Sequence, residues 1–85
     1  MSDSYIAASI HPFVLGQEIY VVKNGERIKT VETTLDQMKD MIFKLSKEYD
    51  INDIDFFGGQ LYALKFKDEL AATKYAARPL NIRIH

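Results

Sequence analysis

The chain has 85 residues, with 11 lysine and arginine residues, 12 aspartate and glutamate residues, two histidines and no cysteine. This length allows one hydrophobic core, so we expect a single domain over residues 1–85. The net charge of −1 argues against nucleic-acid binding driven by bulk charge, and the lack of cysteine excludes disulfides, thiolate metal sites and a cysteine nucleophile.

The first predicted elements are strands. Residues 5–10 are expected to form an additional N-terminal strand that ends at His11 and Pro12. Further along, Asn24 and Gly25 lie between two β-rich runs, which is the signature of a two-residue type I′ hairpin turn. This turn predicts four cross-strand pairs, namely Lys23 with Glu26, Val22 with Arg27, Val21 with Ile28, and Tyr20 with Lys29.

This pairing gives the hairpin two faces. The face expected to join the core carries Ile19, Val21, Ile28 and Thr30. The face expected to meet solvent carries Tyr20, Val22, Arg27 and Lys29.

A helix is predicted over residues 34–49. Thr34 followed three residues later by Gln37 has the form of a capping box. Apolar residues then recur at helical spacing over four turns, at Leu35, Met38, Met41, Ile42, Leu45 and Tyr49.

The segment from residue 54 to residue 67 fits two structures. One alternative is a long helix from Gln60 to Arg78; the other is a strand in which Tyr62, Leu64 and Phe66 alternate with Ala63, Lys65 and Lys67. We expect the strand, because a three-residue loop at 58–60 then pairs Phe56 with Tyr62 and Ile54 with Leu64 on one apolar face.

The remaining residues predict a short helix over 69–77 capped by Asp68 and a last strand over 80–84. The expected fold is a two-layer α+β domain, an antiparallel sheet with two helices on one face. Its order is (β)ββα-ββα-β, which contains the ferredoxin-like split β-α-β-β-α-β core.

Groups that could perform acid–base or nucleophilic chemistry are scarce in the sequence. His11 precedes a proline and is expected in a turn, and Ser4 and Ser9 have no evident base partner. The acidic residues around 50–55 miss the calcium-loop pattern, because Ile54 stands at a ligand position and Asp55 stands where glycine is required. We therefore expect a non-enzymatic protein with no catalytic residue, metal or cofactor.

The first residues lack the basic and long apolar regions of a secretory signal, and no apolar run is long enough to span a bilayer. We expect a cytoplasmic protein without membrane contact. Its size is typical of phage and bacterial accessory proteins.

The function hypothesis rests on the sheet face that two helices on the other side leave bare. The residues expected there, which include Val22 and Ala63, are too apolar for a plain solvent face. We therefore expect a small binding or regulatory protein that uses this face, or an edge strand, for a protein partner or for self-association. The expected contact residues are Tyr20, Arg27, Lys29, Phe57 and Leu61.

The alternative is a nucleic-acid-binding accessory protein that uses a local aromatic and basic patch. The residues that would form this patch are Tyr20, Lys23, Arg27, Lys29, Lys65, Lys67, Arg78 and Arg83.

Overall fold

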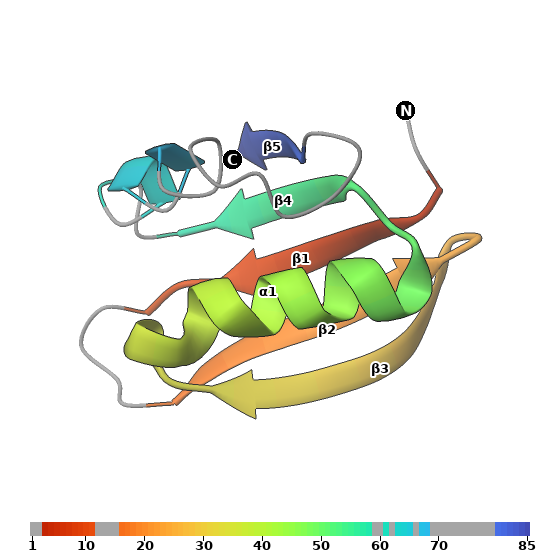
Figure 1. The fold of residues 1–85 in the computed structure, drawn as a ribbon, viewed down its shortest axis with the longest axis horizontal. Coiled ribbons are helices and arrows are strands. Elements are labelled where there is room, and N and C mark those ends of the chain that lie inside the picture. Colours follow the sequence, from red (N-terminus) through yellow and green to blue (C-terminus); the bar gives the residue numbers. More distant parts are fainter. Residues whose placement is uncertain (1–2, 12–15, 59–60, 62, 66, 69–79) are drawn as a thin grey trace.

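A computed structural model describes residues 3–11, 16–58, 61, 63–65, 67–68 and 80–85 (Figure 1). The elements in chain order are β1 (Tyr5–Ser9), β2 (Gln17–Lys23), β3 (Glu26–Thr33), α1 (Leu35–Tyr49), β4 (Asp53–Phe57) and β5 (Asn81–Ile84). Residues 61, 63–65 and 67–68 are also helical. The N-terminal strand, the hairpin, the first helix and the last strand are therefore confirmed.

The β2–β3 hairpin turns at Asn24 and Gly25, which both have positive φ, of 53° and 79°, as a type I′ turn requires. Its register is as predicted only next to the turn, where Lys23 pairs with Glu26 and Val22 with Arg27. A β-bulge between Val21 and Val22 then shifts the ladder by one residue.

The bulge corrects two predicted pairs and two predicted core residues. Val21 pairs with Lys29 instead of Ile28, and Tyr20 pairs with Thr30. Ile28 is left as the extra residue of the bulge and is 45% exposed, so its assignment to the core was wrong. The assignment of Thr30 to the core was also wrong, because Thr30 pairs with Tyr20 on the opposite face and is exposed.

Helix α1 starts where the sequence predicts. Thr34 is the N-cap, and its Oγ1 accepts a hydrogen bond of 3.3 Å from the backbone N–H of Gln37. The buried side of the helix carries Met38, Ile42 and Leu45, which pack on β1, β2 and β3 across one face of the sheet (Figure 1).

The sheet has five strands in the order β3-β2-β1-β4-β5 and is mixed. The β1–β2 and β2–β3 pairs are antiparallel, whereas β1–β4 and β4–β5 are parallel. The expected fully antiparallel sheet is therefore wrong. Parallel neighbours need a crossover connection, which an α-helix usually provides, and this requirement applies to the segment between β4 and β5.

The described residues of that segment are helical, so the predicted strand over 61–67 and its hairpin with β4 are wrong. Ala63 is fully buried in the same core cluster as Met38 of α1, while Leu61 and Leu64 are exposed. The second helical segment thus lies on the α1 side of the sheet. The ferredoxin-like core is wrong as well, and the predicted helix over 69–77 lies outside the described residues.

Candidate interaction face of the sheet

The face of the sheet opposite α1, called the outer face below, carries every second residue of each strand. Ile6, Ile19 and Ile54 point into the core under α1, so their strand neighbours point the other way. The strand registers arrange the outer face in three rows, which run in the order β3-β2-β1-β4-β5. At the carboxyl end of β1 the row is Glu32, Glu18, Ser9 and Phe57, and it is extended by His85, whose ring stacks on Phe57. The middle row is Thr30, Tyr20, Ala7, Asp55 and Arg83. The last row is Arg27, Val22, Tyr5, Asp53 and Asn81.

Apolar and aromatic side chains occupy the centre of the outer face. Ala7 and Val22 are buried by their neighbours, and Tyr5, Tyr20 and Phe57 are partly exposed. No helix among the described residues lies on this face, and the three rings keep part of their surface exposed. Aromatic side chains supply large contact areas at interfaces.

Arg27 lies flat on one of these rings. Its guanidinium carbon is 3.9 Å from the centroid of the Tyr20 ring, which is a cation–π contact. The arginine is exposed, so the ring fixes the position of the side chain while its N–H groups remain accessible.

A buried carboxylate anchors the β4–β5 side of the outer face. Asp55 is only 7% exposed, and its Oδ1 accepts a 2.8 Å hydrogen bond from Nε of Arg83. Nε2 of His85 lies 3.6 Å from the same oxygen, and the His85 ring stacks on Phe57 with 4.7 Å between centroids. The ion pair with Arg83 compensates the cost of burying the Asp55 carboxylate in the sheet.

The β2–β3 side of the outer face is acidic at one end. Glu18 and Glu32 are exposed and lie directly opposite each other across the two strands. A Cβ added to Gly16 would lie 2.5 Å from Oε1 of Glu32, so the glycine leaves the space that this carboxylate occupies. Like charges in directly opposed positions repel, which favours a cationic group brought by a partner.

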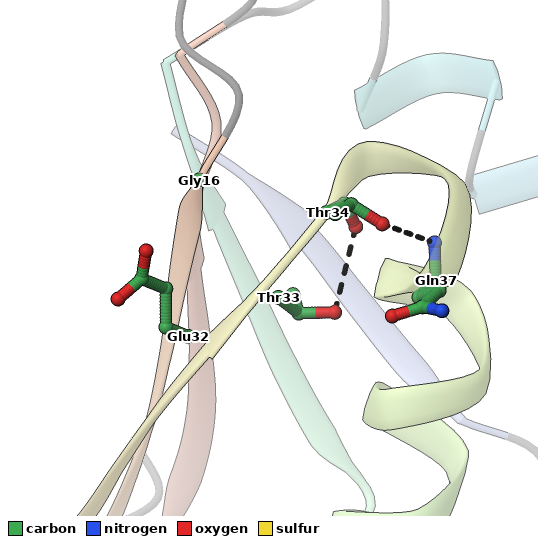
Figure 2. Close-up of a pocket in the computed structure, with 5 residues that line it drawn as sticks. All are labelled: Gly16, Glu32, Thr33, Thr34 and Gln37. Carbon is green, nitrogen blue, oxygen red and sulfur yellow. Dashed lines mark hydrogen bonds between the residues drawn. The ribbon is translucent and has the colours of Figure 1, made fainter.

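A shallow hollow of about 380 Å³ lies beside this acidic end, lined by Gly16, Glu32, Thr33, Thr34 and Gln37. Figure 2 shows that Glu32 points to one side of its strand while Thr33 points to the other, toward Gln37. The hydroxyl of Thr34 is engaged as the cap of α1. The polar groups of the hollow therefore do not converge on a common point, as a catalytic site requires.

One polar arrangement was missed at the sequence level. Nε2 of His11 lies 3.0 Å from Oγ of Ser9, so this serine does have an imidazole neighbour. The side chain of Gln17 is fully buried and holds the backbone of His11 with two hydrogen bonds, 2.6 Å to its N–H and 2.7 Å to its carbonyl oxygen. These bonds fix the start of the β1–β2 connection.

The structure brings together only part of the predicted contact set. Tyr20 and Arg27 touch, and Phe57 shares the outer face with them, on the other side of β1. The placement of Lys29 and Leu61 on this face was wrong. The bulge turns Lys29 to the α1 side, where its Nζ is 6.0 Å from the Tyr49 ring centroid, and Leu61 is 83% exposed on the second helical segment.

The residues of the nucleic-acid alternative are spread over several surfaces. Lys23 is exposed beside the hairpin turn, and Lys65 and Lys67 are exposed on the second helical segment. Arg83 is paired with Asp55, and Arg78 lies outside the described residues. Within the described part of the chain these cations do not form one patch with Tyr20.

Two further properties concern the described residues alone. They contain no cluster of three histidine, aspartate or glutamate side chains that could hold a metal ion. None of their helices is long and apolar enough to cross a membrane.

No family model and no curated protein matches the sequence. A solved structure matches the fold: a protein from Bacteroides thetaiotaomicron described as having an actin-like ATPase fold and unknown function. The match has a TM-score of 0.74 at 15% sequence identity and covers 100% of this chain and 34% of that protein. The chain thus spans about a third of that protein's length, and the likeness shows the fold alone.

Proposed function

We propose that this chain is a non-enzymatic binding or regulatory protein whose outer face docks a protein partner. The observation that supports this proposal is the combination of three partly exposed aromatic rings with an arginine fixed on one of them, Arg27 on Tyr20. Rigid aromatic side chains and arginines carry most of the binding energy in typical protein interfaces.

The face is better suited to docking than either edge of the sheet. The edge strand β3 carries exposed charges at Glu26, Arg27, Lys29 and Glu32, and it also carries the bulge, with Ile28 as the extra residue. Charges and bulges are the devices that natural sheets use to prevent edge-to-edge pairing. The opposite edge, β5, has four residues and offers a short ladder. We therefore assign the contact to the face.

The test is a pair of charge insertions on the outer face with a matched control. Tyr20→Asp and Phe57→Asp place a carboxylate in the apolar centre, while Lys44→Asp makes a similar change on the exposed side of α1. Binding of host proteins and of a tagged second copy of the chain by the immobilised chain is quantified for each variant, with circular dichroism to confirm folding.

We expect each outer-face variant to lose at least about tenfold of the captured partner, and the control to keep it. A folded Tyr20→Asp protein that retains its partner would overturn the proposal. Binding of oligonucleotides at low salt, lost with rising salt and unaffected by Tyr20→Asp, would instead support the nucleic-acid alternative.

A further inference from the structure

The charges on the β2–β3 half of the outer face are divided between its two ends. Glu18 and Glu32 lie at one end and Arg27 at the other, about 15 Å away along β3 at the usual rise per strand residue. All three side chains are exposed, and none forms an ion pair with another described residue. On this half of the face the charge therefore changes from negative to positive along the strands, and these charges have no ion-pair partner among the described residues.

Such a surface is complementary to itself. Consider a two-fold axis that lies in the plane of the contact, perpendicular to the strands and level with the middle row. This axis places the acidic end of one copy over Arg27 of the other, and does so twice. It also brings Tyr20 of each copy against Tyr20 of the other.

The residues of the middle row allow the two copies to approach each other closely at this axis. Ala7 and Thr30 are small, and Asp55 and Arg83 neutralise each other within one copy. Two sheets pack face to face at about 10 Å with their strands roughly aligned, which leaves room for the Tyr20 and Phe57 rings between them.

We propose that the partner docked on the outer face is a second copy of this chain, related by this two-fold axis, with Arg27 of each copy bound to Glu32 and Glu18 of the other. The inference rests on the proposed function and names its partner. Exposed ion pairs add little affinity but select one geometry over others. The aromatic centre supplies the contact area, and the charges set the orientation.

The decisive experiment uses two single charge reversals, Arg27→Glu and Glu32→Arg, measured alone and mixed by sedimentation equilibrium. In the proposed geometry each variant opposes like charges in its own dimer, so self-association weakens at least roughly fivefold. A mixture of the two restores both ion pairs, because Arg27 of the Glu32→Arg chain meets Glu18 and Glu32 of the Arg27→Glu chain, and the two substituted side chains meet as a pair of opposite charge. We expect the mixed dimer to regain affinity within about twofold of the wild type. Glu48→Arg on exposed α1 is the control.

Three results would overturn the inference. The first is a wild-type chain that stays monomeric while Tyr20→Asp still abolishes capture of another protein; this leaves the proposed function intact. The second is self-association that neither reversal changes. The third is a mixture of folded variants that associates no better than each variant alone. If Tyr20→Asp affects neither self-association nor capture, the proposed function fails together with the inference.

Discussion

Replacing Arg83 with methionine is expected to destabilise the fold by about 2 kcal/mol. The change removes the 2.8 Å bond to Asp55 and leaves a carboxylate that is 7% exposed without its cation. Breaking a fully buried pair from one side costs about 3–5 kcal/mol, whereas exposed pairs contribute about 0.2–1 kcal/mol. The Arg83 side chain is 34% exposed, so water reaches the site and the cost lies between these limits.

The assay is thermal and urea unfolding of four proteins: the wild type, Arg83→Met, Asp55→Asn and the double variant. For a domain of this size 2 kcal/mol corresponds to a decrease in Tm of roughly 8–16 °C. The double variant should lose only about 1 kcal/mol, because no buried charge is left unpaired. Asp55→Asn should cost less than Arg83→Met, since the arginine can be hydrated.

The reasoning is refuted if Arg83→Met costs less than about 0.5 kcal/mol, the range of ordinary surface substitutions. It is also refuted if the double variant loses the sum of the two single losses, because the residues would then be energetically independent.

Three further predictions concern backbone positions and are checked by the same unfolding measurements. Gln17→Ala should cost about 2–3 kcal/mol, because it removes two hydrogen bonds to the backbone from a fully buried site. Gly58→Ala should cost more than Gly25→Ala; both have positive φ, but only at Gly58 would the new Cβ lie 2.8 Å from a backbone oxygen, that of Ile10. Equal losses would contradict this. Thr34→Ala should cost about 1 kcal/mol as a lost N-cap, with no change expected from Thr34→Ser.

The elements whose structure is determined by residues close together in the sequence could be predicted from the sequence. The hairpin turn needs only Asn24 and Gly25, and α1 needs only its cap and its apolar stripe. The segment after β4 could not be assigned in this way. Its alternating apolar residues fit a strand, but leucine, alanine and lysine are also strong helix formers, and the parallel β4–β5 pairing requires a crossover.

The residues of the outer face were predicted correctly only where signals from nearby residues in the sequence determine their position. Tyr20 and Arg27 meet because they are neighbours across the hairpin, close to the turn that sets their register. Lys29 was misplaced because the bulge at Ile28, which directly precedes it, reverses the side chains beyond it. The Ser9–His11 pair did have a sequence signal: residues two apart on an extended chain lie on the same side.

The position of β1 has a consequence for how the chain folds. This strand is first in the sequence, but it is the centre of the sheet, and its pairing of Ile6 with Ile54 joins residues 48 positions apart. The β2–β3 hairpin and α1 involve only local contacts and can form early, whereas closing so long a loop slows the β1–β4 pairing. During synthesis β1 therefore emerges long before β4. Its edge toward β4 stays unpaired, while its other edge pairs with β2, until β4 and β5 have been synthesised.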